Sequence, residues 1–260
     1  MKKTLIVLMM VMMAAMLIVS CDNKTAGVHK VTFTVTGGTG SYDDQEVADG
    51  GKATKSETDP TPSDTVHYVF DCWTLEGGDD AYDFNEKVTE DINLVAKWKY
   101  KYAKGDTGPA GGTIITVCTD DTLDWKFIEL APTSAGSGDI GDFESGQYTY
   151  TGWDKEQENT TLLKSYLRTN CVTSTVIALA DDYKTTGSDG KVYTDWYLPT
   201  KDQIKDAAGY LTTACWTSST IISYGGSSGT MDGQFWVYCT DGTLDRNSGR
   251  NYAIYCIRRF

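Results

Sequence analysis

The sequence predicts an α+β protein in which β-strands predominate. Its 260 residues suffice for one large domain or two small ones. Aromatic residues are plentiful, with 16 Tyr and 7 Trp, and 26 Gly separate short runs in which apolar and polar residues alternate. Alternation with period two between turn residues is typical of strands, whereas helical spacing is confined to a few short segments. The chain is therefore expected to fold around sheets with few helices.

The first twenty residues are typical of an export signal. Lys2 and Lys3 precede an apolar run from Thr4 to Val19, which is short for a membrane-spanning helix. The run ends in Ile18-Val19-Ser20-Cys21, which resembles the lipobox of bacterial lipoproteins. In that family the signal is cut before the cysteine, so the resemblance implies that Cys21 becomes a lipid-modified N-terminus anchored in a membrane. The alternative is an ordinary signal peptide with a chance cysteine.

A short polar tether, residues 21–30, is expected between the lipid and the first domain, residues 31–99. The first domain shows strand-like alternation in four places. In the last of these, every second side chain is apolar and points to one face. The predicted strands begin at Val31, Gln45, His67 and Asp91, and the apolar face of the last comprises Ile92, Leu94, Ala96 and Trp98.

The first domain resembles the Listeria–Bacteroides repeat, a small module of internalin-type and many other bacterial surface proteins. The resemblance covers the whole module and implies a small β-grasp-like sheet that acts as a spacer or contacts a partner. One position departs from the family, which usually has glycine before the central tryptophan where this chain has Cys72. The matching residues are Val31-Thr32-Phe33, the segment from Val47 to Ala53, Tyr68, Phe70, Trp73, Tyr82, Phe84 and the closing Ile92-x-Leu94-x-Ala96-x-Trp98.

The second domain, residues 103–260, opens with a glycine-rich turn at Gly105–Gly112. Strands are predicted after it at Thr113–Val117 and Trp125–Leu130, and helices at Asn159–Leu167 and Ser174–Asp181. The best-signalled helix follows Pro199. There Thr200 is expected as the N-cap, and Gln203 three residues later completes a capping box.

Three further strands are expected after this helix, at Trp216–Ser219, Gln234–Cys239 and Tyr252–Phe260. The last strand needs a partner to be ordered. Its expected partners are the first strand of the same domain or the Gln234 strand.

Five segments of the second domain carry a resemblance to the bacterial domain family typified by the C-terminal domain of the Legionella collagen-like adhesin. That family is similar to C-type-lectin-like and sulfatase-modifying folds. The resemblance implies an α+β domain with paired N- and C-terminal strands and a ligand face made of long loops. The segments are Gly105-Asp-Thr-Gly-Pro-Ala-Gly-Gly112, Trp125-x-Phe-x-Glu-x-Ala-Pro132, Asp195-Trp-Tyr-Leu-Pro-Thr-Lys-Asp-x-Ile204, Trp216-Thr-Ser-Ser219 and Cys256-Ile-Arg-Arg-Phe260.

Composition and spacing weigh against several classes of function. The net charge is −13 with no basic segment, which argues against nucleic-acid binding. The second domain contains no histidine, so it lacks Ser-His pairs, Cys-His pairs and His-ligated zinc. Its acidic pairs lack the spacing of a calcium loop, and no cofactor or metal is expected. The six further cysteines are either disulfide-bonded or free and buried. They are Cys72, Cys118, Cys171, Cys215, Cys239 and Cys256.

Ligand contacts are expected in two polar loops, residues 223–233 and 241–251. Three tryptophans are read as core residues, because they lie in or beside predicted strands, with stacking on a ligand as the alternative. These tryptophans are Trp196, Trp216 and Trp236. The candidate ligand-binding residues in the loops are Tyr224, Asp241, Arg246, Asn247 and Arg250.

The sequence therefore predicts a non-catalytic, lipid-anchored protein of the cell envelope. It would sit at the outer membrane or cell surface, with the inner membrane as an alternative, and bind a protein or a glycan in adhesion. Two other functions are weighed against this one. The first is a structural spacer lipoprotein without a dedicated ligand, and the second is an enzyme related to the sulfatase-modifying proteins, which use a reactive cysteine pair.

Overall fold

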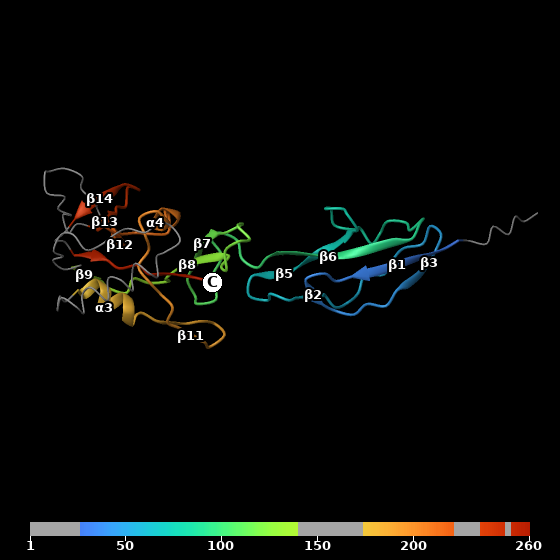
Figure 1. Cartoon of the computed structure of the whole chain (residues 1–260), viewed down its shortest axis with the longest axis horizontal. Helices are drawn as coiled ribbons and strands as arrows, with labels where there is room; N and C mark the ends of the chain where they lie inside the picture. Colours follow the sequence, from blue (N-terminus) through green and yellow to red (C-terminus); the bar gives the residue numbers. More distant parts are fainter. Residues whose placement is uncertain (1–26, 140–173, 221–234, 248–250) are drawn as a thin grey trace, which may run out of the picture. The chain divides into compact units, whose positions relative to one another are not determined.

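The computed structural model of the chain describes residues 27–139, 174–220, 235–247 and 251–260 (Figure 1). Over these residues the fold is β-rich with few helices, as the sequence predicts. The chain divides into two compact units, Met1–Lys99 and Tyr100–Phe260. Among the described residues, no helix is both long and apolar enough to cross a membrane.

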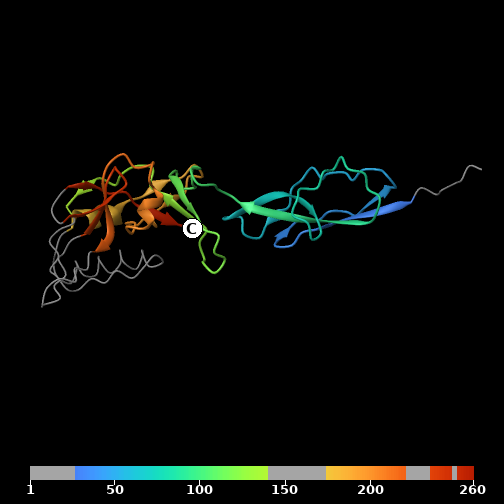
Figure 2. The same cartoon turned by 90° about the horizontal axis from the view of Figure 1, so that it is seen from above.

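The first unit is built on one four-stranded sheet. Its strands are β1 (Val28–Thr34), β3 (Gln45–Ala48), β5 (Tyr68–Leu75) and β6 (Ile92–Tyr100), in the order β3-β1-β6-β5. The central strands β1 and β6 are parallel, whereas β3 is antiparallel to β1. Figure 2 shows the long β6 in green along this unit. Two short strands, β2 (Gly38–Thr39) and β4 (Thr61–Pro62), form a second sheet.

One face of the four-stranded sheet carries the core of the first unit. Leu94 and Ala96 are buried there, and Ile92 and Trp98 pack against the same cluster, which confirms the predicted apolar face of β6. Trp73 lies at the centre, with edge-to-face ring contacts to the neighbouring aromatic side chains. Alternation along the strand thus sets which side chains of this unit are buried.

One local expectation for the first unit is wrong. β1 begins at Val28, inside the predicted tether, because Val28 pairs with Ala48 and the Asp49 amide donates to Gly27 O at 2.6 Å. Cys72, at the position where the repeat family has glycine, lies within the continuous strand β5.

The second unit contains a three-stranded sheet and a five-stranded sheet. The three-stranded sheet has the order β16-β8-β7, with β7 (Thr113–Val117), β8 (Phe127–Leu130) and β16 (Ile257–Arg259). The five-stranded sheet has the order β14-β13-β12-β15-β9. Its strands are β9 (Ser137–Gly138), β12 (Cys215–Thr220), β13 (Phe235–Tyr238), β14 (Leu244–Asn247) and β15 (Tyr252–Ala253).

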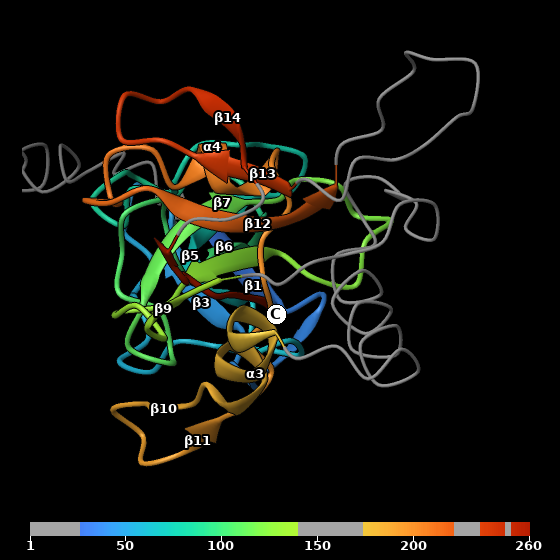
Figure 3. The same ribbon diagram turned by 90° about the vertical axis from the view of Figure 1, so that its left-hand side faces the viewer.

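A hairpin and two helices complete the described part of the second unit. The hairpin joins β10 (Thr185–Thr186) to β11 (Val192–Tyr193), and Figure 3 shows it next to helix α3 (Thr175–Asp182). Ser174 caps α3, since its hydroxyl accepts from the Ile177 amide at 3.3 Å. The predicted helix at residues 159–167 lies outside the described residues.

The second helix, α4 (Gln203–Asp206), has Asp202 at its N-cap without a side-chain cap bond, so the regular helix begins later than the predicted N-cap Thr200. The hydrogen bonds of the predicted capping box are nevertheless present. The Gln203 amide donates to Thr200 Oγ1 at 3.2 Å, and the Thr200 amide donates to Gln203 Oε1 at 3.0 Å. The Ile204 amide also donates to Thr200 O, so Thr200 accepts the first helical bond of this turn. The helix is one turn long, and the chain then turns through Gly209 with φ 89°.

The pairing expected for the end of the chain is wrong. Residues 252–260 form two strands and not one, because the intervening segment bonds elsewhere: the Ile254 amide donates to Gly136 O, and Cys256 O accepts from the Ala131 amide. β15 therefore joins the five-stranded sheet, while β16 pairs with β8. The first strand of the domain, β7, also pairs with β8, so the first and last strands flank a shared neighbour without pairing to each other.

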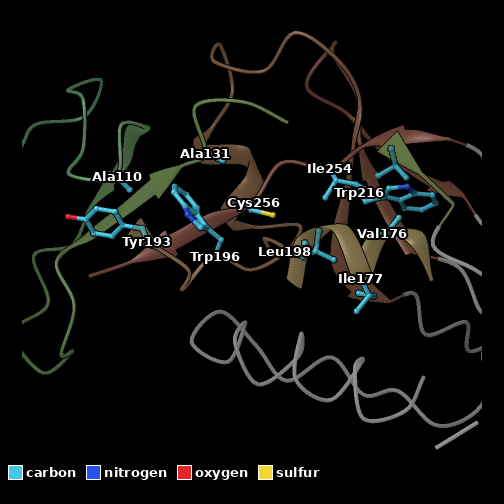
Figure 4. Packing of buried hydrophobic residues seen from close by; sticks show 12 residues of the cluster. Ala110, Ala131, Val176, Ile177, Tyr193, Trp196, Leu198, Trp216, Ile254 and Cys256 are labelled. Atoms are coloured by element: carbon cyan, nitrogen blue, oxygen red, sulfur yellow. The ribbon is translucent and has the colours of Figure 1, made fainter. Parts of the chain in front are cut away.

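Two apolar clusters fill the second unit. The first, shown in Figure 4, places Trp216 beside Val176 of α3 at one end and Trp196 beside Tyr193 at the other. The second cluster includes Ile115, Ile128 and Ile257 from all three strands of the smaller sheet. All four residues of β8 are buried, and one of them, Glu129, is an acid.

Candidate functional site

Glu129 is a carboxylate with no solvent exposure in the middle of the apolar strand β8. An ionised side chain in such surroundings is costly unless it is paired and hydrogen-bonded. The polar groups that surround Glu129 therefore define the most unusual chemistry in the described part of the second unit.

The glycine-rich turn supplies backbone donors to this carboxylate. Glu129 Oε1 accepts from the Gly112 amide at 2.7 Å and from the Ala110 amide at 3.1 Å. The turn is closed by a hydrogen bond from the Gly108 amide to Gly112 O at 2.9 Å, and Gly111 has φ 86°, a region that favours glycine. A Cβ at Gly108 would lie 2.6 Å from Glu129 Oε1 and would overlap its carboxyl carbon. The turn thus has the form of an anion-binding nest.

Arg258 of β16 supplies the positive charge. It lies directly opposite Glu129 in the strand register, and its Nη1 donates to Glu129 Oε2 at 3.0 Å. Its Nε and Nη2 donate to the two carboxylate oxygens of Asp195, both at 2.9 Å, in a bidentate pair. The side chain of Arg258 is 6% exposed, whereas that of Asp195 is 45% exposed. The centre therefore runs from a fully buried acid to a half-exposed one.

Aromatic rings enclose the guanidinium group. The Cζ atom of Arg258 lies 4.6 Å from the ring centroids of both Tyr193 and Phe260. Tyr193 also donates its hydroxyl hydrogen to Asp189 Oδ2 at 3.1 Å, and Lys191 Nζ lies 4.9 Å from its ring centroid. These contacts fix the hairpin of β10 and β11 to the charged centre.

The electrostatics of the centre follow from burial and pairing. Burial raises the pKa of Glu129 above its ordinary value, although the Gly112 amide and Arg258 act in the opposite direction. Burial lowers the pKa of Arg258, but hydrogen bonds and charge from Asp195 and Glu129 outweigh it and raise the pKa overall. With all three groups ionised, two negative charges share one positive charge. This arrangement can hold three chain segments together. The Nε, Nη1 and Nη2 atoms of Arg258 all donate to carboxylates of the protein itself.

Of the five residues predicted to bind a ligand, Tyr224 and Arg250 lie outside the described residues, as does the predicted lipidation site Cys21. Asp241 is exposed, but its carboxylate accepts from the Thr243 amide at 2.9 Å and from the Thr243 hydroxyl at 2.6 Å, so it shapes the turn between β13 and β14.

Arg246 and Asn247 do not lie in a loop as predicted. Both belong to β14, which pairs with β13 along all four of its residues. The physical reason is the tight turn before β14, in which the Cys239 amide donates to Thr243 O at 2.9 Å and returns the chain directly onto β13.

Two of the three tryptophans read as core residues are buried as predicted. Trp196 belongs to the first apolar cluster, and Trp216 is fully buried with its Nε1 donating to Gly138 O at 2.8 Å. Trp236 lies in β13, and its side chain is outside the described part. The buried pair stabilises the fold and offers no surface for stacking on a ligand.

The five cysteines in the described ranges are all free thiols. Burial raises the pKa of Cys215 and of Cys256 to about 12, so neither forms a thiolate at neutral pH. Cys171 lies outside the described residues. Within the described ranges, no group of three or more His, Cys, Asp or Glu side chains could hold a metal ion.

Glu129, Asp195 and Arg258 lie within the segments that carry the resemblance of the second domain, but the sequence predicts no role for any of them. A signal for two of them was present, because Glu129 interrupts the apolar run 127–131, and Arg258, with Arg259 beside it, stands in the otherwise apolar run 252–260. Lysine, arginine and acidic residues are almost never fully buried unless they are paired. A charge in each of two apolar runs therefore indicates a buried pair, although it does not identify Asp195.

Comparison with known proteins identifies the first unit. Residues 29–97 match the model of the Listeria-Bacteroides repeat domain, which confirms the resemblance seen in the sequence. No curated protein and no solved structure matches the chain.

Proposed function

We propose that this chain is a non-catalytic, lipid-anchored protein of the bacterial cell envelope that binds a protein or a glycan through its second unit. The match of residues 29–97 to the Listeria-Bacteroides repeat domain carries this proposal. The resemblance seen in the sequence associates that repeat with bacterial surface proteins. The lipobox-like Ile18-Val19-Ser20-Cys21 supports a lipid anchor immediately before the repeat. In this arrangement the repeat, with a β-grasp-like fold, is the spacer.

The second unit is proposed to be a C-type-lectin-like head. The mixture of small sheets and short helices in the described ranges supports this assignment. Its last strand departs from the expected pairing, since β16 and β7 both pair with β8. Because both strands pair with β8, the first and last strands of the domain still lie in one sheet.

A binding role fits the chemistry of the described side chains better than catalysis. Glu129 and Arg258 are enclosed and paired with each other, and the thiols of Cys215 and Cys256 are buried and protonated. An enzyme of the sulfatase-modifying type needs an accessible, reactive cysteine pair. Replacement of Cys215, Cys239 and Cys256 tests this alternative, because loss of a measured activity in a folded variant would support an enzyme.

The anchor is tested by metabolic labelling with a radioactive fatty acid. The wild-type chain is expected to incorporate label and to fractionate with membranes, and Cys21→Ser is expected to lose both properties. Cys72→Ser is the matched control and should keep both. Labelling that persists in Cys21→Ser would contradict the lipid anchor at this residue. In a separate experiment, protease treatment of intact cells would show which face of the envelope carries the protein.

The binding role is tested with glycan and protein arrays probed by residues 22–260. The proposal expects saturable binding of one class of ligand that disappears when the second unit is unfolded. A chain that is folded, as shown by cooperative unfolding, yet binds nothing saturably would favour the structural spacer. The two tests are independent, since a lipid anchor is compatible with either outcome on the arrays.

A further inference from the structure

The geometry around Glu129 points to a carboxylate-binding site that the protein fills with its own side chain. We propose that the turn Gly108–Gly112 and Arg258 form a receptor for one carboxylate group, and that Glu129 is its intramolecular ligand. In this account the Glu129 side chain occupies the receptor in the folded second unit. The inference does not depend on the proposed binding role.

Two observations on the donors support a built receptor. The carboxylate is met by two backbone amides, from Gly112 and Ala110, and by the Nη1 atom of Arg258. The guanidinium group is itself buried, and Asp195 holds it in place from the opposite side. Convergent amides and a fixed guanidinium are the donors that proteins use for free carboxylates and other anions.

The shape of the turn is fitted to the carboxyl group. The three atoms nearest to a Cβ built at Gly108 are all atoms of the Glu129 side chain. By contrast, a Cβ at Gly112 would overlap Leu130 O, which is backbone and present whatever side chain stands at position 129. Glycine at position 108 therefore makes room for the ligand, whereas glycine at position 112 makes room for the strand.

The atoms that Glu129→Ala removes define the class of ligand that could replace them. Glu129→Ala removes one methylene and the carboxylate, which together correspond to acetate. Acetate is therefore the carboxylate tested on this variant, and its methyl group must lie at van der Waals distance from the remaining Cβ. Formate, which lacks that methyl group, is the shorter probe. Propionate is longer by one methylene, and acetamide has the shape of acetate without the charge that Arg258 pairs with.

The first experiment measures unfolding of full-length Glu129→Ala by heat and by urea with increasing sodium acetate, at constant ionic strength kept with sodium chloride. Ligand binding to the folded state alone should raise the folding equilibrium constant about 100-fold when acetate reaches about 100 times its dissociation constant. The wild-type chain should show no such saturable rise, because its receptor is filled. The double variant Glu129→Ala/Arg258→Met should lose the response.

A variant that does not fold alone still decides the question. Glu129→Ala would then be refolded with and without acetate, and protease resistance would be measured. Acetate should restore resistance, and acetamide should not. Absence of a specific acetate effect in both assays, or an equal effect of acetate on wild type, would overturn the receptor.

A double-mutant cycle with Gly108→Ala gives a second, independent test. In the wild-type background the new methyl group must displace the Glu129 carboxylate, so the unfolding equilibrium constant should rise by about tenfold or more. In the Glu129→Ala background the carboxylate is gone, and Gly108→Ala should have little further effect. Gly112→Ala is the matched control and should be damaging in both backgrounds. Additive effects for Gly108→Ala would contradict the proposal.

Discussion

Replacement of Arg258 by methionine should strongly destabilise the second unit, and the structure indicates which partner is responsible. Methionine keeps much of the apolar length of arginine but removes three hydrogen bonds, one to Glu129 and two to Asp195. Asp195 is 45% exposed, so water can replace its lost bonds and its share is about 1 kcal/mol or less. Glu129 has no exposure and would remain as a buried charge without a counterion. Removal of one partner from a buried pair costs about 3–5 kcal/mol, and most of this cost should come from Glu129.

The source of the cost can be measured by a second substitution and by pH. Glu129→Gln in the Arg258→Met background removes the stranded charge and keeps an oxygen that can accept from the Gly112 amide. The double variant should therefore be more stable than Arg258→Met alone, by about 1–3 kcal/mol. The pKa of Glu129 is raised mainly by burial, and loss of the cation would raise it further. Stability from a group whose folded pKa is raised is fully present below the unfolded pKa and is lost as pH rises through the folded pKa, so Arg258→Met should regain stability as pH falls from 7 toward 5.

The assay is urea unfolding of the full chain, followed by hydrogen exchange of second-unit amides so that the first unit does not contribute. Arg259→Met on the same strand is the matched control. Its side chain is half-buried, and it should cost about 1 kcal/mol or less. The reasoning fails if Arg258→Met costs no more than this control, or if the double variant is no more stable than the single one.

Three further predictions concern other parts of the chain. Thr200→Val should cost about 1–2 kcal/mol in urea unfolding, because the Gln203 amide loses its buried acceptor, and an equal stability of the two proteins would argue against the capping box. Cys215 and Cys256, with pKa values of about 12, should resist alkylation at pH 8 in the folded protein and react only on unfolding, so rapid native labelling at either thiol would contradict their burial. Burial raises the pKa of Asp64, but hydrogen bonds from the neighbouring histidine and its backbone outweigh this and lower the pKa overall. Its contribution is present above the unfolded pKa and lost as pH falls through the folded one, so Asp64→Asn should flatten the loss of first-unit stability below about pH 4, and an unchanged acid limb would contradict this assignment.

Local features of this fold were predictable from sequence because they depend on neighbours along the chain. The capping box of Thr200 and Gln203 is formed by side chains three residues apart, and it is present as predicted. The apolar face of β6 follows from alternation alone, and Leu94 and Ala96 are buried on it. The bounds of β7, Thr113–Val117, were also correct, since glycine-rich and polar segments delimit that strand on both sides.

Long-range pairing could not be predicted, because it depends on contacts between residues that the sequence does not connect. β14 was read as a loop, since Leu244-Asp-Arg-Asn247 has only one apolar residue, and it is a strand because the preceding turn brings it against β13. The break between β15 and β16 depends on bonds from residues near Ala131 and Gly136, more than a hundred positions away. The loop predicted for Arg246 and Asn247 is wrong for the same reason, because loops were chosen by composition and not by position on the folded domain.

Four of the five segments that carry the resemblance of the second unit meet at one charged centre. The glycine-rich turn contributes the Gly112 amide, the strand after it contributes Glu129, the Asp-Trp-Tyr-Leu-Pro segment contributes Asp195, and the last strand contributes Arg258. Removal of any one of these parts leaves a buried polar group without its partner, which the fold tolerates poorly. The charged centre therefore links four segments that are far apart in the sequence. These segments are therefore explained by the packing and charge of the second unit and do not by themselves indicate a ligand.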